Sequence, residues 1–246
     1  MLLIRSVTFN VLFYLNLAFY LLAALPTLVL PRWGIIGLAR SWARVNLWLL
    51  RVVCRIGVEW RGLDKIPAGA LIVAGKHQSM WETFALLTLF PDPTFILKRE
   101  LMWIPLFGWC LWRGEMIPID RGAGKAVIPA MLVHARRALA ERRQIIIFPE
   151  GTRRAPGAEP QYKYGVAHLN GLGIAPCLPI ALNSGLYWAR RRMLRRPGTI
   201  RVEILDPIAP GLDNETFFPH LQDVIEHATA RLIAEGEREL GAWAAD

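Results

Sequence analysis

Acidic residues are missing from the first 58 positions of this 246-residue chain, in which Glu59 is the first carboxylate. The same segment contains six arginines and no lysine, so it carries +6 of the net charge of +9. Between Val7 and Leu30 there is no charged residue of either sign. This balance indicates a partner of negative charge, either a nucleic acid or an anionic membrane surface.

Cysteine is scarce, and several catalytic sequence patterns are absent. The three cysteines match no metal-ligand spacing, which predicts reduced thiols facing the cytoplasm and behaving as small buried hydrophobic residues. None of the four serines stands in the G-x-S-x-G pattern of a serine hydrolase. A nucleotide-binding P-loop is excluded at "RGAGKA", because Ile119 replaces its first glycine and Ala126 its hydroxyl residue. The five histidines form no zinc pattern.

Apolar residues and tryptophan are abundant, which favours the membrane over a nucleic acid. Hydrophobic residues make up 54% of the chain, and there are ten tryptophans, a side chain that suits the headgroup level of a bilayer. The stretch Val7–Leu30 is long enough to cross or deeply enter a bilayer, and Pro26 would kink it. A cleaved signal peptide fits less well, because only Arg5 precedes the apolar run and that run is too long. We expect a retained membrane segment.

Four arginines follow in "IIGLARSWARVNLWLLRVVCRIG". At about 100° per residue, Arg40, Arg44, Arg51 and Arg55 fall within a helical stripe about 60° wide. The rest of the helix is largely Ile, Leu, Val and Trp, which fits a membrane interface with the cations toward phosphate headgroups. The alternative is an amphipathic helix packed on a soluble core, which four arginines without an acidic neighbour make less favourable. Residues 1–57 are therefore predicted to form a membrane-docking helical pair.

Short β-rich runs alternate with helical patterns after residue 57. We expect strands at Val58–Arg61, Ala70–Ala74, Thr94–Leu97, Met116–Ile119, Gln144–Phe148, Cys177–Leu182 and Thr199–Leu205. We expect helices near Trp81–Leu89, Lys125–Arg142, Tyr164–Leu172 and Phe217–Leu240. This alternation predicts an α/β fold with a mostly parallel central sheet flanked by helices. Without an internal repeat or a long linker, residues 58–246 are expected to form one catalytic domain.

A histidine and a carboxylate lie five residues apart in "GKHQSMWETF", between two apolar runs. On a continuous helix His77 and Glu82 would point about 140° apart and could not touch. If His77 lies on the loop after a strand and Glu82 in the first turn of the next helix, the carboxylate can bind one imidazole nitrogen. That contact would fix the tautomer and leave the other nitrogen as a base. Taken alone, a histidine near a glutamate is more often a structural pair.

Four blocks between about residues 75 and 185 resemble, in order, those of the glycerolipid acyltransferases, specifically the bacterial lysophosphatidic acid acyltransferases. The first is "KHQSMWET", similar to the family's His-x4-Asp motif but with Glu82 in place of the aspartate. The others are "KRELMWIPLFGWCLWRGEMIPIDR", "FPEGTR" followed by "YKYG", and "IAPCLPIAL". The N-terminal helical pair also fits this family.

The resemblance implies a reaction that needs neither an acyl-enzyme nor a cofactor. His77 would remove the proton from the free hydroxyl of a lysophospholipid, which attacks the thioester of an acyl donor, while Glu82 holds the imidazole. With lysophosphatidic acid as acceptor the product is phosphatidic acid. The thioester of coenzyme A or of acyl carrier protein would be the co-substrate, and Ser79 would be a bystander.

The resemblance also implies a set of substrate-binding residues and no metal site: Lys98, Arg121, Glu150, Gly151, Thr152, Arg153, Lys163 and Pro179. Arg153 would pair with the acceptor phosphate, because a guanidinium binds phosphate oxygens in a bidentate fork. Gly151 would let the backbone approach the ligand closely. Pro179 would shape the side of the acyl donor.

The implied location is the bacterial inner (cytoplasmic) membrane, with the catalytic domain facing the cytoplasm. The basic stretch "WARRRMLRRP" could bind the coenzyme phosphates, an acyl carrier protein or anionic lipid, or simply be solvated. Nucleic-acid binding fits poorly, because arginine and tryptophan concentrate in the membrane-like segment. Another lysolipid acceptor, such as a lyso-ornithine lipid, and a catalytically silent membrane-binding protein are the alternatives.

Overall fold

A computed structural model describes residues 1–122 and 124–245 of the chain. Within them, seven strands form one sheet in the order β1-β7-β6-β2-β5-β3-β4. Their bounds are Ile56–Arg61 (β1), Leu71–Gly75 (β2), Pro93–Lys98 (β3), Ile117–Ile119 (β4), Gln144–Ile147 (β5), Cys177–Leu182 (β6) and Gly198–Ile204 (β7). All neighbours pair in parallel except β6 and β7. The predicted mostly parallel α/β fold is confirmed, and every expected strand is present within two residues of its predicted bounds.

Five strands, β2 to β6, run in the same direction, so their carboxyl ends meet along one side of the sheet, which we call the carboxyl edge. The central strands β2, β5 and β6 are buried along their whole length. Their nearly continuous apolar sequences suit a sheet covered on both faces. In open α/β sheets, ligands bind outside the carboxyl ends of the strands. The carboxyl edge is therefore where a site is expected.

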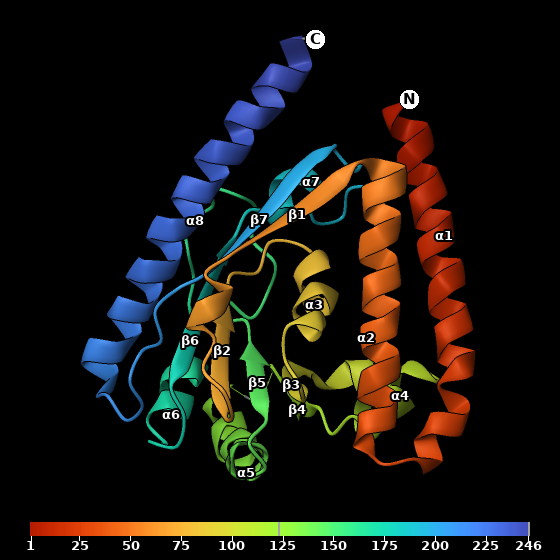
Figure 1. Ribbon diagram of the computed structural model, residues 1–246. Helices are drawn as coiled ribbons and strands as arrows, with labels where there is room; N and C mark the ends of the chain where they lie inside the picture. Colours follow the sequence, from red (N-terminus) through yellow and green to blue (C-terminus); the bar gives the residue numbers. More distant parts are fainter. Residues whose placement is uncertain (123, 246) are drawn as a thin grey trace.

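Helices cover both faces of the sheet (Figure 1). One face carries α5 (Val127–Ala140), α6 (Gly165–Asn170) and the long α8 (Asn214–Ala245). The other carries α3 (Trp81–Ala85), with α2 (Arg32–Leu49) packed behind it and α1 (Leu2–Ala23) outermost. Each of these helices overlaps a predicted helical segment.

Two short helices were not predicted from the sequence, namely α4 (Phe107–Arg113) and α7 (Ser184–Tyr187). The α4 sequence, FGWCLWR, is apolar on nearly every side and only seven residues long, so it shows no helical periodicity. The four residues of α7 span about one turn, which is too short for any periodic pattern.

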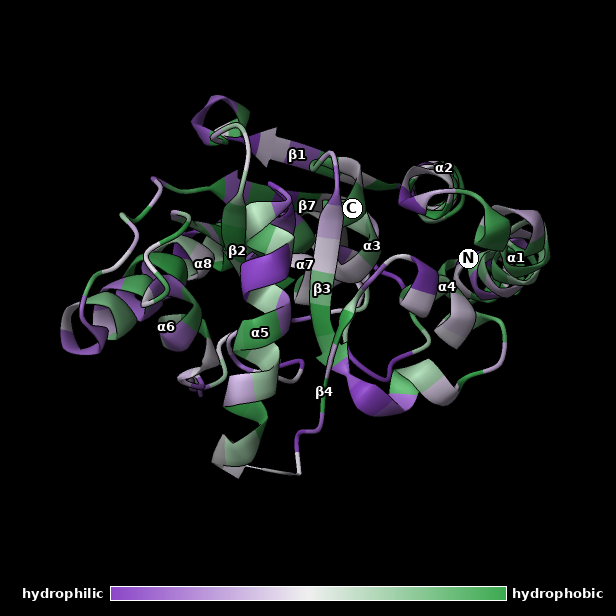
Figure 2. Ribbon diagram, turned by 90° about the horizontal axis from the view of Figure 1, so that it is seen from below, coloured by the Kyte–Doolittle hydropathy of each residue, from purple (hydrophilic) through white to green (hydrophobic). Residues whose placement is uncertain are grey.

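The first two helices form an antiparallel pair, joined by a 3-10 turn that contains Pro26. Phe9 and Phe13 are buried and pack edge-on against Trp188 of the α/β domain that contains the sheet. The outer side of α1 is exposed and apolar, and its ribbon in Figure 2 is coloured mostly hydrophobic. Among the described residues, α1 is the one helix that is long and apolar enough to cross a membrane.

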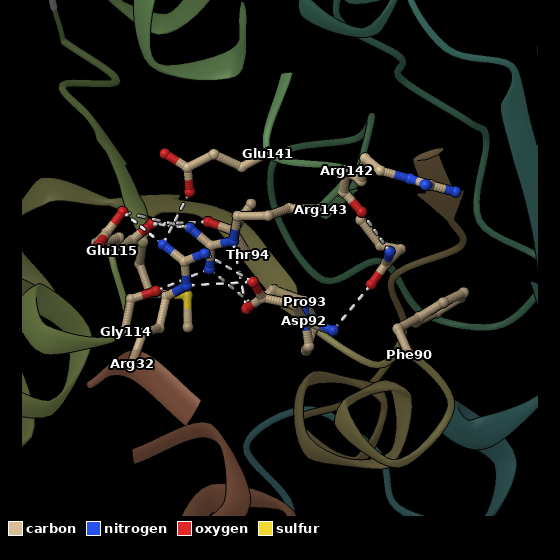
Figure 3. Close-up of polar contacts among 12 residues, drawn as sticks. Arg32, Phe90, Asp92, Pro93, Thr94, Gly114, Glu115, Glu141, Arg142 and Arg143 are labelled. Carbon is tan, nitrogen blue, oxygen red and sulfur yellow. Dashed lines mark hydrogen bonds and ion pairs between the residues drawn. The ribbon is translucent and has the colours of Figure 1, made fainter. Parts of the chain in front are cut away.

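Both ends of this helical pair are attached to the α/β domain. Near the start of α1, Ser6 Oγ accepts a hydrogen bond from the backbone of Arg195 at 2.9 Å. At the other end, Arg113 Nε donates to the carbonyl of Leu28 at 2.9 Å. Arg32, at the start of α2, forms ion pairs of 2.8 to 3.0 Å with three carboxylates, those of Asp92, Glu115 and Glu141 (Figure 3). The pair therefore packs along its whole length instead of extending away from the domain.

The predicted arginine stripe is only partly present. Arg44, Arg51 and Arg55 are exposed, as expected for cations that face headgroups. Arg40 instead turns inward and donates to the carbonyls of Leu87 and Phe90, and burial lowers its pKa. The prediction is wrong for Arg40, because the carbonyls at the end of the α3 segment accept its guanidinium in place of a headgroup.

Candidate active site

His77 lies at the carboxyl edge, two residues after β2, and Glu82 is the second residue of α3. This strand–loop–helix arrangement lets the carboxylate fold back, and His77 Nδ1 lies 2.9 Å from Glu82 Oε1. The contact expected from the sequence is therefore present. The side chain of Glu82 is fully buried, whereas that of His77 is 12% exposed, so the imidazole is the member of the pair that a substrate can reach.

Glu82 accepts hydrogen bonds from four directions. Its Oε1 receives the backbone N–H groups of Gln78 and Ser79, at 2.6 and 2.7 Å, as well as His77 Nδ1. Its Oε2 receives the hydroxyl of Ser184 at 2.8 Å. Oε1 of Glu82 already accepts two backbone N–H groups and acts as an acceptor toward His77 as well. Nδ1 of His77 must therefore be the donor and carry the hydrogen. The tautomer is thereby set, and Nε2 keeps its lone pair for a proton.

The imidazole of His77 is also fixed by stacking. Its ring lies 4.1 Å from that of Phe148, with only 14° between the planes. Phe148 follows β5, the neighbour of β2 in the sheet. Together with Glu82, Phe148 restricts the ring to one orientation.

The "FPEGTR" loop docks directly on the histidine loop. The backbone N–H of Arg154 donates to the carbonyl of His77 at 2.8 Å. Gly151 has φ = 65°, in the left-handed region that favours glycine. A Cβ there would lie 3.4 Å from the exposed side chain of Lys163, an ordinary contact distance. That Gly151 admits a ligand stays a prediction.

Glu150 does not face the open side of this loop. Its buried Oε1 lies 3.0 Å from Lys76 Nζ, and its Oε2 lies 3.4 Å from the backbone nitrogen of His77. Lys76 also contacts Glu226 of α8 at 2.7 Å, and the hydroxyl of Tyr162 donates to Glu226 at 2.8 Å. Burial raises the pKa of Glu150, against the charge of Lys76. This buried cluster supports the backbone of His77, so the expected direct contact of Glu150 with an acceptor is not supported.

Arg153 and Thr152 are half-buried beside the histidine loop. Among the described residues, the Arg153 guanidinium has no carboxylate within ion-pair distance. Burial and the charges of Arg190 and Arg191 lower the pKa of Arg153, against the opposing charge of Glu82. A guanidinium in this setting is available to an anion that enters beside the His77–Glu82 pair.

Lys98 and Arg121 lie on the same edge but further along the sheet. Lys98 ends β3, and Arg121 follows β4 by two residues, so parallel pairing places both at the carboxyl edge. Both are exposed, as is Lys163. Lys98 forms a 2.8 Å ion pair with Glu100, and that contact lowers the pKa of Glu100. The basic side chains thus border the edge that carries His77.

Pro179 lies inside the sheet. It is buried in the middle of β6, opposite Ala74 of β2, and its carbonyl accepts a hydrogen bond from Leu205. The expectation that Pro179 shapes the side of the acyl donor is not supported by this position. The residues of β6 that pair with β7 are Ile180 to Leu182, and Pro179 directly precedes them.

Sequence reasoning missed two polar residues of the site. Ser184 lacks a nucleophile elbow, yet its hydroxyl binds Glu82 from 102 residues away. Lys76 has no partner nearby in the sequence, because Glu150 and Glu226 are distant from it along the chain. For Ser184 a signal did exist, since it follows a predicted strand of the same edge. Among the described residues, no group of three His, Cys, Asp or Glu side chains could hold a metal ion.

One hollow among the described residues lies away from the His77–Glu82 pair. About 580 Å³ opens beside Arg32, Trp33 and Asp92, at the amino end of β3. The arginines that line it already bind carboxylates or carbonyls of the protein. Its position at the amino ends of the strands sets it apart from the edge that carries His77.

Comparisons with known proteins point to one family. The family model described as Acyltransferase matches residues 57–183, which include His77 and the "FPEGTR" loop. A 1-acyl-sn-glycerol-3-phosphate acyltransferase of Pseudomonas aeruginosa is 34% identical over 231 residues, which cover 94% of this chain and 82% of that protein. The alpha form of this enzyme from Mus musculus is 30% identical, over 73% of this chain and 65% of its own length.

A solved structure supports the fold. The crystal structure of the 1-acyl-sn-glycerophosphate (LPA) acyltransferase from Thermotoga maritima superposes with a TM-score of 0.74. It covers 94% of this chain and 99% of its own, at 21% sequence identity. The shared architecture includes the N-terminal helical pair, because the coverage extends over nearly the whole chain.

Proposed function

This chain belongs to the acyltransferase family that includes the 1-acyl-sn-glycerol-3-phosphate acyltransferases, and we propose that it converts lysophosphatidic acid to phosphatidic acid. The acyl group comes from a thioester of coenzyme A or of acyl carrier protein. The observation that carries the proposal is the His77–Glu82 contact at the carboxyl edge, with an arginine that has no ion-pair partner among the described residues beside it.

His77 is the general base of the proposed reaction. Its Nε2 takes the proton from the sn-2 hydroxyl while that oxygen bonds to the thioester carbonyl carbon. When the tetrahedral intermediate collapses, the carbon–sulfur bond breaks and the protonated imidazole returns the proton to the leaving thiolate. No acyl-enzyme forms, which agrees with the buried position of Ser79 and Ser184. Glu82 offsets the charge that His77 acquires.

The "FPEGTR" loop binds the acceptor in this proposal. Arg153 pairs with the acceptor phosphate, Thr152 lies beside it, and Lys98, Arg121 and Lys163 add positive charge along the same edge. Glu150 acts on His77 through the backbone, as a positioning residue. Gly151 shapes the loop, since its left-handed φ of 65° favours glycine.

The membrane location is proposed to be interfacial, with α1 lying along one leaflet of the cytoplasmic membrane. Its exposed apolar side suits insertion between lipids. If α1 crossed the bilayer, its two ends would lie on opposite sides, whereas both ends contact the catalytic domain. Anionic lipid would attract the exposed Arg44, Arg51 and Arg55.

This location can be tested with a cysteine at Val29, which is 87% exposed in the turn after α1. We expect an impermeant maleimide to label it in inside-out vesicles and not in right-side-out vesicles. Labelling from the opposite side would show that α1 spans the bilayer. The parent protein, with its own three cysteines, gives the background.

Acyl transfer to 1-acyl-glycerol-3-phosphate tests the reaction. We expect detergent-purified protein to form phosphatidic acid from a long-chain acyl thioester, and His77→Ala to lose about 10²–10⁴-fold in kcat. His134→Ala, which changes an exposed histidine on α5, is the matched control and should keep full activity. Equal activity of His77→Ala and the parent would remove His77 from the mechanism. Failure of the parent on a panel of lysolipids would instead indicate a silent binding protein.

A further inference from the structure

Five arginines are concentrated in the loop between α7 and β7, residues 188–197, which we call the arginine loop. Four of them are exposed and one is buried: Arg190, Arg191, Arg192 and Arg196 are exposed, and Arg195 is buried. Among the described residues, none of the four exposed arginines forms an ion pair with a carboxylate. The loop therefore presents positive charge that the protein itself does not neutralise.

The arginine loop is held in a fixed shape by its buried member. Arg195 Nη1 donates to the carbonyls of Arg192 and Met193, at 2.6 and 2.8 Å. Its Nη2 donates to Asn10 of α1 at 2.9 Å, and its guanidinium lies 4.3 Å from the Trp188 ring. Burial lowers the pKa of Arg195 to about 10. Such a buried cation is costly, and here it orders the backbone from which the exposed arginines extend.

Of the exposed arginines, Arg190 contacts the active-site loop, and Arg191 is its neighbour in the chain. Arg190 Nη1 donates to the backbone carbonyl of Arg153 at 2.9 Å, and the next residue, Arg154, bonds to the carbonyl of His77. Arg191 has φ = 56°, a left-handed conformation that turns the chain sharply at this point. Both lie close enough for their charges to act on the pKa of Arg153. Arg192 and Arg196 show no such interaction with Arg153.

We propose that Arg190 and Arg191 complete, with Arg153, a binding site for a dianionic phosphate monoester, and thereby select acceptors with a free phosphate over those with a phosphodiester. The inference rests on the proposed function, since the monoester is that of lysophosphatidic acid. A phosphate monoester carries about −1.5 to −2 at pH 7 and three terminal oxygens. A diester carries one charge and two such oxygens, so it gains less from three guanidinium groups.

Two other sources offer the same phosphate chemistry, namely the coenzyme of the donor and the headgroups of a bilayer. A bilayer surface would be expected to engage all four exposed arginines in a similar way. A site beside His77 should depend on Arg190 and Arg191 alone. The exposed Arg192 and Arg196, from the same loop and with the same charge, therefore provide matched controls.

The test compares four single variants with the parent in detergent micelles: Arg190→Gln, Arg191→Gln, Arg192→Gln and Arg196→Gln. A long-chain acyl coenzyme A is the donor, and 1-acyl-glycerol-3-phosphate and 1-acyl-glycerophosphoglycerol are the acceptors. For Arg190→Gln and Arg191→Gln we expect the KM for the monoester to rise about tenfold or more, as for loss of a charge-assisted hydrogen bond. The KM for the diester and for the donor should change little, and both control variants should match the parent.

Three results would overturn the inference. One is an unchanged preference for the monoester in Arg190→Gln and Arg191→Gln. A second is a raised KM for acyl coenzyme A only, which would assign the arginines to the donor. A third is an equal loss in all four variants, with weaker binding to phosphatidylglycerol vesicles, which would assign the loop to the membrane. A parent inactive on both acceptors would instead refute the proposed function, and this inference with it.

Discussion

Replacing Glu82 with glutamine would remove a buried charge while preserving the hydrogen bonds around it. The amide oxygen can take the place of Oε1, which accepts from His77 and from two backbone N–H groups. The amide nitrogen then faces Ser184, whose hydroxyl can turn to accept instead of donate. The orientation and tautomer of His77 should therefore be kept in Glu82→Gln. The variant thus isolates the electrostatic part of the role of Glu82.

The expected loss follows from the geometry of the pair. With Nδ1 and Oε1 2.9 Å apart, the centres of charge of the carboxylate and imidazolium lie about 4 Å apart. At an effective dielectric constant of about 20 they attract by about 4 kcal/mol. The Glu82 side chain has no exposed surface, so screening by water is weak there. Loss of this attraction should lower kcat about 10³-fold, since each ~1.4 kcal/mol is a factor of ten.

Release of the free thiol from an acyl coenzyme A, with saturating 1-acyl-glycerol-3-phosphate, would measure this loss. Ser184→Ala is the control, because it removes one hydrogen bond to Glu82 and keeps the charge; we expect a decrease of about tenfold. A folded Glu82→Gln enzyme that keeps more than about a tenth of the parent kcat would refute the electrostatic argument. A larger loss in Ser184→Ala than in Glu82→Gln would mean that geometry, not charge, dominates.

Three further predictions concern stability and reactivity. Lys76→Met leaves Glu226 and the buried Glu150 without their cation. It should lower the free energy of unfolding, measured by urea denaturation, by about 3–5 kcal/mol. An unchanged free energy of unfolding would contradict the pairing of these three side chains. Hydrogen bonds from Arg61 hold the pKa of the Glu235 carboxyl below its usual 4.5, so the stability from this pair is full above about pH 4.5 and is lost as pH falls further. Arg61→Gln should weaken this acid dependence of Tm. If Tm changed with pH in the same way in the variant and the parent, the Arg61–Glu235 pair would not be its cause. Burial raises the pKa of the fully buried Cys177, so a thiol reagent should leave it unmodified in the native protein, and rapid labelling would contradict that burial.

The sequence by itself determined the fold class and the position of the His77–Glu82 pair. Uniformly apolar runs such as Gln144–Ile147 predict buried strands, and the apolar N-terminal stretch predicts α1 with its exposed hydrophobic side. The spacing of His77 and Glu82 works because a strand, a loop and a helix follow one another between Leu71 and Ala85. These features are local, so periodicity and spacing can reveal them.

The tertiary structure decided which polar side chains meet. Glu150 finds Lys76 across 74 residues, Ser184 finds Glu82 across 102, and Arg195 reaches Asn10 across 185. Arg40 likewise donates to a carbonyl of a neighbouring segment instead of facing the expected headgroup layer. No local pattern encodes such contacts, because they depend on how the sheet brings distant loops to one edge. The physical reason is the same in each case: a buried polar group must find a partner, and only the assembled fold determines which one lies within reach.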